Sequence, residues 1–174
     1  ENIGLVKTAS KKMSQFYNGE RSAKETFDLE KMAAFFAVLD ATYTTHALFF
    51  SSKLYYNPLN GLFEPVPRDG HRQLPNYHKF NNNYYEKTIL DSIYNPESPD
   101  ELGNNLQIHS GRQWWIKKFF INENGKINND FYKLYIKYLT KISSESYLKS
   151  FFDSRKNEIE KINSHIYSDY FFYS

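Results

Sequence analysis

The chain has 174 residues, enough for one domain with a hydrophobic core. Its 22 basic and 20 acidic residues give a formal net charge of only +2, which argues against a nucleic-acid-binding protein, since such proteins present a strongly basic face. The absence of cysteine excludes disulfides, thiolate metal sites and a cysteine nucleophile. No apolar run is long enough to span a membrane. The compartment stays open, with the cell surface and secretion among the candidates.

The sequence begins with Glu1 rather than methionine, so we expect a fragment, a mature form or a trimmed chain. We expect residues 1–174 to form a single domain. Aromatic residues make up 18% of the chain, with 15 Tyr and 15 Phe. They predict either a core built of aromatic rings or an exposed stacking surface for sugars, and the core is the favoured interpretation.

Helical patterns dominate the first 43 residues. The stretch LVKTASKKMSQFY, residues 5–17, has helical character. Asp28 is a good N-cap for a second helix in FDLEKMAAFFAVLDATY, residues 27–43, and Glu30 suits the positive end of its dipole. Apolar residues surround this second helix instead of forming one stripe, which predicts that it lies in the middle of the domain.

A β-hairpin is predicted next, pairing residues 53–56 with residues 62–66. Asn60-Gly61 is a strong turn signal because both residues tolerate positive φ, and Pro58 presets the entry to the turn. Pro65 and Pro67 predict that the second strand is short or lies at an edge.

Residues 70–112 form a long polar stretch in which YYEKTILDSIY predicts one short helix. The segment QWWIKKFFI offers Trp114, Trp115, Phe119 and Phe120 for burial, and ENGK predicts a turn.

Two helices are predicted in the last third of the chain. The first begins after Asn128 or Asn129, with apolar residues at helical spacing at Phe131, Leu134, Tyr135, Tyr138, Leu139 and Ile142. The second begins after Ser143 or Ser144, with an inner stripe of Leu148, Phe151, Phe152, Ile159, Ile162 and Ile166. We expect the two to pack as an antiparallel pair. The expected fold class is mainly α with one central β-hairpin, α+β.

Few residues carry an obvious chemistry. There is no glycine-rich phosphate loop, HExxH, GxSxG or paired zinc-ligand spacing. Asp69 stands out because it follows a predicted strand and precedes Gly70. A carboxylate at the end of a hairpin can hold Mg²⁺ together with substrate phosphates. The alternative is that Asp69 is a turn residue, since Asp-Gly is itself a common turn pair.

The stretch that ends on Asp69 resembles the spore-coat protein H (CotH) family of atypical protein kinases, particularly its divergent bacterial members. FDLEKMAAFFAVLDA looks like the family's buried helix, KLYYNPLNGLFEPV like its hairpin, and Pro67-Arg68-Asp69 like its Pro-Trp-Asp-like closing segment. The predicted C-terminal helices are similar to the family's terminal helical pair. The resemblance implies the C-terminal lobe of a kinase-like fold. It also implies transfer of the ATP γ-phosphoryl group to Ser residues of a protein substrate, with Mg²⁺ or Mn²⁺.

The resemblance implies roles for individual positions. Asp69 would carry over as the metal-binding acid. Counting back from the hairpin aligns the family's catalytic Asp with His46, and its metal-binding Asn, a cofactor-binding residue, with Ser51. Aligning on the family's loop histidine instead places the catalytic Asp at Thr44. Neither His46 nor Thr44 is acidic, and no ATP-gripping small lobe is recognisable in residues 1–26. We therefore expect a degenerate kinase homologue that retains Asp69 and has lost the catalytic base; if it did transfer phosphate, His46 would be the substitute base.

Two non-catalytic alternatives remain. One is a module that binds a protein or a glycan through exposed Tyr and Trp. The other is an assembly module joined through the C-terminal helices. The oligomeric state is left open.

Overall fold

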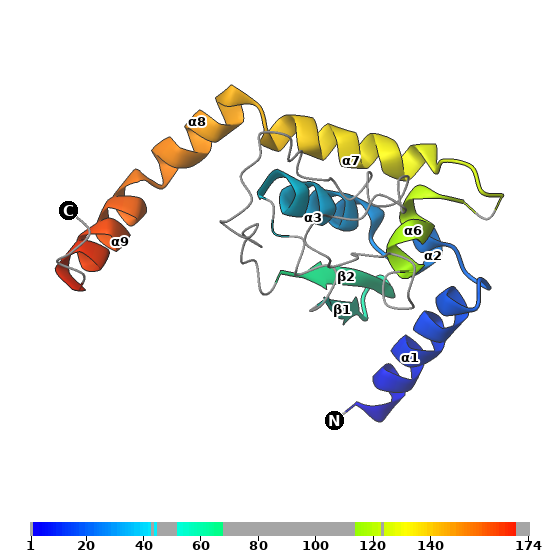
Figure 1. The fold of residues 1–174 in the computed structure, drawn as a ribbon. Helices are drawn as coiled ribbons and strands as arrows, with labels where there is room; N and C mark the ends of the chain where they lie inside the picture. Colours follow the sequence, from blue (N-terminus) through cyan, green and yellow to red (C-terminus); the bar gives the residue numbers. More distant parts are fainter. Residues whose placement is uncertain (1, 43, 45–51, 68–113, 123, 170–174) are drawn as a thin grey trace, which may run out of the picture. The chain divides into compact units, whose positions relative to one another are not determined.

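The computed structural model describes residues 2–42, 44, 52–67, 114–122 and 124–169. This part of the chain is mainly helical and has a two-stranded antiparallel hairpin, as predicted (Figure 1). The chain forms two compact units, Glu1–Leu139 and Thr140–Ser174. The single-domain prediction stays a prediction, and the short helix predicted within residues 70–112 lies outside the described residues.

The N-terminal segment forms two helices, of which only the first was predicted. Helix α1 spans Ile3–Tyr17 and begins where the Asn2 side chain accepts a hydrogen bond from the Leu5 N–H, at 3.1 Å. Helix α2 spans Ala23–Thr26 and starts with a capping box, in which Ser22 and Glu25 bond each other's backbone N–H groups. The first four backbone N–H groups of a helix have no partner within the helix, so a capping box stabilises even a single helical turn.

Strands β1 (Lys53–Asn57) and β2 (Leu62–Val66) form the predicted hairpin, with Lys53 opposite Val66 and Asn57 opposite Leu62. Gly61 has φ 69°, a conformation that glycine adopts without strain and that the Asn-Gly pair predicts. On its other edge, β2 forms a single parallel bridge from Phe63 to Phe27. Strand β2 therefore has a partner on both edges, β1 on one and Phe27 on the other.

Helix α3 (Leu29–Thr42) packs one side into the core of the first unit. Its N-cap is Asp28, whose Oδ1 accepts from the Lys31 N–H at 3.1 Å. Its buried residues are Met32, Ala33, Phe36, Ala37 and Leu39. The expectation that the helix is covered all round is wrong, because Val38 keeps 43% of its surface exposed. The spacing of the buried residues gives one broad stripe, and Val38 points away from it.

Aromatic rings build the core, which confirms the favoured interpretation of the composition. Helix α6 (Trp114–Phe120) brings Phe119 and Phe120 against α3, so that the Phe36 centroid lies 5.4 Å and 6.0 Å from theirs. Within the described residues, the fully buried aromatic side chains are Phe16, Phe27, Phe36, Phe119, Phe120, Phe131 and Tyr135. Edge-to-face and stacked contacts of this kind stabilise the core beyond the area that the rings bury.

Helix α7 (Asn129–Ile142) closes the first unit. Asn128 is its N-cap, with the side-chain oxygen 3.4 Å from the Phe131 nitrogen. Phe131 and Tyr135 are buried, as their helical spacing predicted. Figure 1 shows α3 between the hairpin and α7, in agreement with the Phe36–Phe131 ring contact at 5.7 Å.

The second unit contains helices α8 (Glu145–Ser154) and α9 (Lys156–Asp169), where the sequence predicted one helix. The break falls at Arg155, which has φ −112° and bonds through its N–H to the Phe152 carbonyl at 3.2 Å. Leu148, Phe151, Phe152 and Ile162, predicted to face inward, are exposed. The antiparallel packing expected of the C-terminal helices stays a prediction.

Replacing Phe36 by Ala should cost about 3–5 kcal/mol of unfolding free energy, because it leaves a cavity among rings on three helices. Val38→Ala on the same helix is the matched control and should cost no more than about 0.5 kcal/mol, since Val38 is exposed. Urea unfolding followed by circular dichroism measures both. Equal losses from the two variants would contradict the one-sided burial of α3.

Candidate functional site

The three predicted site residues, His46, Ser51 and Asp69, lie outside the described residues. The structure describes α3 and the hairpin, which flank His46 and Ser51 in the sequence, and the hairpin also precedes Asp69. What it establishes is therefore how these flanking elements are fixed. Two clusters of polar contacts do this, one at each end of α3.

The start of α3 is joined to the hairpin through the backbone. The Asp28 N–H donates to the Phe63 carbonyl at 2.9 Å, next to the Phe27–Phe63 bridge. The rings of Phe27 and Phe63 are also in contact, with centroids 5.9 Å apart. Phe27 thus forms an isolated bridge to the outer edge of β2, and α3 begins two residues later.

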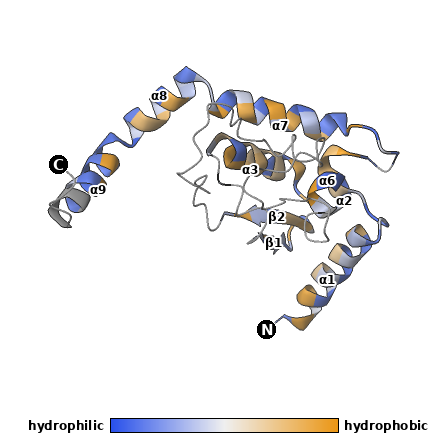
Figure 2. Cartoon of the chain, viewed as in Figure 1, coloured by the Kyte–Doolittle hydropathy of each residue, from blue (hydrophilic) through white to orange (hydrophobic). Residues whose placement is uncertain are grey.

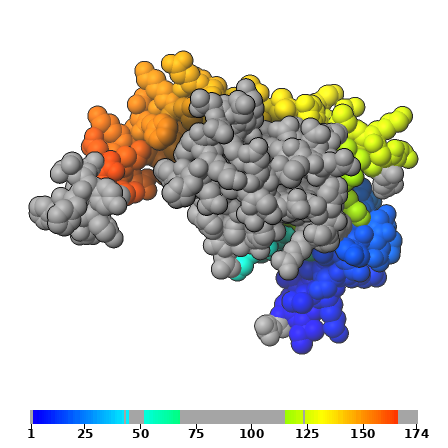
Figure 3. Space-filling model, viewed as in Figure 1, coloured from blue at the N-terminus to red at the C-terminus, as the bar shows by residue number. Residues whose placement is uncertain are grey.

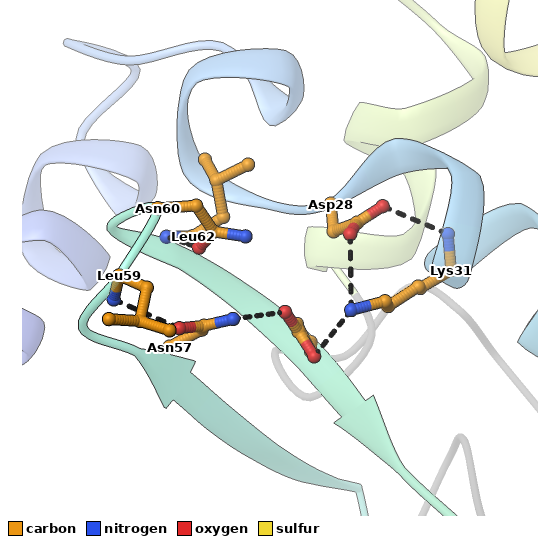
Figure 4. Close-up of polar contacts among 7 residues, drawn as sticks. Asp28, Lys31, Asn57, Leu59, Asn60 and Leu62 are labelled. Atoms are coloured by element: carbon orange, nitrogen blue, oxygen red, sulfur yellow. Dashed lines mark hydrogen bonds and ion pairs between the residues drawn. The ribbon is translucent and has the colours of Figure 1, made fainter.

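Side chains extend this connection into a network that we call the hairpin lock, formed by Asp28, Lys31, Asn57 and Glu64 (Figure 4). The Lys31 ammonium lies 2.8 Å from Glu64 Oε2 and 3.5 Å from Asp28 Oδ2. The other Glu64 oxygen accepts from Asn57 Nδ2 at 2.8 Å. Helix α3, β2 and β1 are therefore tied by one chain of contacts.

The hairpin lock sets one positive charge, that of Lys31, against the two negative charges of Asp28 and Glu64. Hydrogen bonds from Lys31 and then Asn57 lower the pKa of Glu64. The same bond to Glu64 raises the pKa of Lys31. The ammonium group stands between the two carboxylates, where a metal ion would otherwise be attracted. Among the described residues, no group of three His, Cys, Asp or Glu side chains is arranged to hold a metal. The contacts of the hairpin lock join α3 to both strands of the hairpin.

The other end of α3 is fixed by a buried tyrosine. The Tyr135 hydroxyl of α7 donates to Asp40 Oδ2, and Tyr135 is fully buried. Asp40 lies within α3, as expected. Beyond the helix, the Thr44 N–H bonds the Leu39 carbonyl at 2.9 Å, a helix-ending bond. Thr44 is one of the two positions matched to the family's catalytic Asp. It is buried, and its hydroxyl lies 2.8 Å from that of Thr42.

A third contact links α3 to α7 near the start of α3. The Tyr138 hydroxyl donates to Glu30 Oε1 at 2.7 Å, and Lys137 lies 3.4 Å from the same oxygen. The bond from Tyr138 is the main reason that the pKa of Glu30 is lowered. The sequence predicted only that Glu30 interacts favourably with the helix dipole. No local pattern in the sequence predicts its hydrogen bond to a residue of α7.

The chain matches no protein-family model, no curated protein and no solved structure. Within the described ranges, no helix combines the length and the apolar character needed to cross a bilayer.

Glu64→Gln should destabilise the protein at neutral pH, and the difference should shrink as the pH falls. Because the pKa of Glu64 is lowered in the folded state, its carboxylate stabilises the fold fully above the ordinary Glu pKa of about 4.3. This stabilisation is lost as the pH drops through the lower pKa of the folded state. Unfolding free energies of both proteins between neutral and acidic pH measure this. Asp130→Asn, on α7, is the control. A difference independent of pH would show that Glu64 acts through packing alone.

Tyr135→Phe should cost about 1.5–3 kcal/mol, since it removes the hydroxyl that bonds a carboxylate while keeping the ring. A double-mutant cycle with Asp40→Asn isolates this pair from the other contacts of Asp40. Thermal or urea unfolding gives the four stabilities. Strictly additive losses would contradict a bond between these two side chains.

Proposed function

We propose that this chain is a degenerate member of the CotH-like atypical protein kinase family, in which Asp69 binds a divalent metal and the catalytic-base position lacks a carboxylate. The kinase-lobe interpretation of the fold belongs to the same proposal. In such a site the metal, Mg²⁺ or Mn²⁺, would hold the β- and γ-phosphates of ATP and neutralise their charge. The acceptor would be a serine of a protein.

The order and register of the described elements support the proposal. Helix α3 is followed by a hairpin, and that hairpin is followed by Pro67, the first residue of the family-like closing segment. Because Lys53 pairs with Val66, the chain enters and leaves the hairpin at the same end. Chain connectivity then attaches Ser51 and Asp69 close to that end, Asp69 within about 7 Å of Pro67. This shared end of the hairpin is the observation that carries the proposal.

The contacts at the end of α3 support degeneracy. Thr44 is buried and engaged with Thr42, so it is not available as a base in place of the family's Asp. Asp40, the nearest acid within α3, is held by Tyr135. His46 is then the remaining candidate base, and an imidazole can accept a proton near neutral pH.

Among the non-catalytic alternatives, assembly is favoured over glycan binding. The ring of Trp115 packs 6.1 Å from Phe36 and 5.9 Å from Phe119, so it contributes to the core. A stacking platform for sugars needs an aromatic face turned to solvent. The exposed aromatic side chains of α8 instead suit contact with a protein.

Wild-type chain should bind Mn²⁺–ATP weakly, and Asp69→Asn should abolish the binding, because the variant removes the negative charge that holds the metal. Asp153→Asn, an exposed acid on α8, is the matched control and should bind as the wild type does. Calorimetric titration with Mn²⁺–ATP measures all three. Wild-type binding that Asp69→Asn leaves intact, or no binding at all, would contradict the proposed role of Asp69.

The same proteins test the proposed degeneracy. With labelled ATP, Mn²⁺ and a serine-rich acceptor, the wild type should transfer little or no phosphate. His46→Asp, which returns a carboxylate to the base position, should raise the transfer rate. Robust transfer by the wild type that depends on Asp69 would show that the active site is complete, and would contradict degeneracy while leaving the family proposal standing.

A further inference from the structure

The chain contains three Asn-Gly pairs, Asn18-Gly19, Asn60-Gly61 and Asn124-Gly125. In each pair the glycine has a positive φ, of 79°, 69° and 71° respectively. Glycine has no side chain to shield its backbone nitrogen, so this nitrogen can reach the side-chain amide of the asparagine before it. The three pairs therefore share one latent reaction, and their surroundings in the fold decide which of them carries it out.

The reaction is deamidation, which makes asparagine a thermally labile residue and needs only water as a co-reactant. The glycine nitrogen loses its proton to solvent and forms a bond to Cγ of the asparagine. The bond from Cγ to Nδ2 then breaks, ammonia leaves and a cyclic succinimide remains. Water opens this ring at either of its carbonyl carbons and gives aspartate or isoaspartate. The asparagine side chain must therefore be free to move, and the glycine N–H must leave its hydrogen bond.

Asn60 is held in the turn of the hairpin. Its Oδ1 accepts a hydrogen bond from the Leu62 N–H at 2.9 Å. The Gly61 N–H donates to the Asn57 carbonyl at 2.8 Å, and the Gly61 carbonyl accepts from the Lys12 ammonium of α1. Both reacting groups are thus bonded, and releasing them requires the hairpin turn to open.

Asn18 is the C-cap of α1 and is exposed, but it also has partners. Its Nδ2 donates to Glu20 Oε1 at 3.3 Å, and its backbone N–H donates to the Ser14 carbonyl at 2.9 Å. The residue before it is fixed as well, because Lys118 of α6 donates to the Tyr17 carbonyl at 3.0 Å. This pair is more accessible than the one in the hairpin, and it is still restrained by the end of the helix.

Asn124 lies in the connection between α6 and α7. Figure 2 draws much of this connection in the blue of hydrophilic residues, and Figure 3 shows the yellow-green part of the chain on the molecular surface. Asn124 and Gly125 are both exposed, and a Cβ added to Gly125 would have no atom within 4 Å. Of the three asparagine side chains, that of Asn124 alone has no hydrogen-bond partner within the described ranges.

The backbone of this turn depends on one neighbour, Asn122. Its Oδ1 accepts from the N–H groups of Asn124 and Lys126, each at 3.0 Å. Its carbonyl accepts from the Gly125 N–H, also at 3.0 Å. Exposed turns of this kind open at a low free-energy cost, without unfolding of the helices that they connect. The Gly125 nitrogen can therefore be released while the rest of the chain stays folded.

We propose that Asn124 is a spontaneous modification site, at which the Gly125 nitrogen displaces the side-chain amide as ammonia and water yields aspartate or isoaspartate in the folded chain. Asn18 reacts more slowly, because its side chain and its backbone are both bonded. Asn60 reacts most slowly, because the hairpin holds both reacting groups.

The product changes the connection between α6 and α7. Either product adds a negative charge at position 124. Isoaspartate also routes the main chain through the former side chain, which inserts an extra carbon before Gly125. The bonds that the N–H groups of Gly125 and Lys126 make to Asn122 then lose their register. The modification therefore loosens the turn that leads into α7.

Incubation of the full chain in mildly alkaline buffer tests the proposal. Peptide mapping by mass spectrometry follows the loss of each amide, and heavy oxygen taken up from labelled water confirms hydrolysis. In the folded protein, Asn124 should react at least about tenfold faster than Asn60, since the reaction at Asn60 needs a larger opening. In guanidinium chloride the three pairs should react at similar rates, because each asparagine is then followed by an unrestrained glycine.

A variant of the turn tests the structural part of the proposal. Asn122→Ala removes the side chain that holds the turn and should speed the loss at Asn124 in the folded protein. Asn157→Ala, at an exposed position of α9, is the matched control and should leave that rate unchanged. Circular dichroism checks that both variants keep their helices.

Four results would overturn the proposal. They are an earlier loss at Asn18 or Asn60 in the folded protein, no loss at Asn124, the same order of rates in guanidinium chloride, and a rate at Asn124 that Asn122→Ala leaves unchanged.

Discussion

The first unit depends on the packing of Phe119 among rings from three separate segments of the chain. Its centroid lies 4.9 Å from that of Phe27, 5.4 Å from Phe36 and 4.9 Å from Phe131. These partners come from the segment before α3, from α3 itself and from α7. Helix α6 therefore joins the N-terminal elements to α7, although many residues separate them in sequence. Lys118, on the same helix, adds hydrogen bonds to the carbonyls of Phe16 and Tyr17 at the end of α1.

The position of the hairpin follows from this core. Phe27 belongs to the ring cluster and also pairs with Phe63, so β2 is set against the core by the residue that leads into α3. The hairpin lock then fixes how the hairpin is oriented on α3, through Lys31 and Glu64. The C-terminal end of α3 is fixed independently, through Asp40 and Tyr135. His46 and Ser51 thus belong to a segment whose two flanking elements, α3 and the hairpin, are both held by specific contacts, and Asp69 follows the hairpin in the sequence.

Local signals in the sequence predicted most of the described elements. Asp28 was identified as a cap, Asn128 was one of two candidate caps, and Asn60-Gly61 predicted the hairpin, because each signal depends on residues that are close in sequence. Helix α2 was missed, although Ser22 and Glu25 have the Ser-x-x-Glu spacing of a capping box. That signal was available, but the four-residue helix it starts has no apolar periodicity of its own.

Other features could not have been predicted from one sequence. The Tyr135–Asp40 bond joins residues 95 positions apart, and the Lys31–Glu64 pair joins a helix to a strand. Tertiary packing creates both, and no local pattern encodes them. The break at Arg155 was also unmarked, since neither glycine nor proline accompanies it. For the site, the sequence predicted His46, Ser51 and Asp69 through a family resemblance, and that prediction still awaits a test.

The most direct test is to measure whether positions 46 and 69 lie side by side. The chain has no native cysteine, so His46→Cys combined with Asp69→Cys supplies a single pair of thiols for a short bis-maleimide cross-linker. The account predicts a rapid cross-link within one chain, detected by mass spectrometry after proteolysis. Both cysteines reacting with single maleimides while no such cross-link forms would contradict the proposed site.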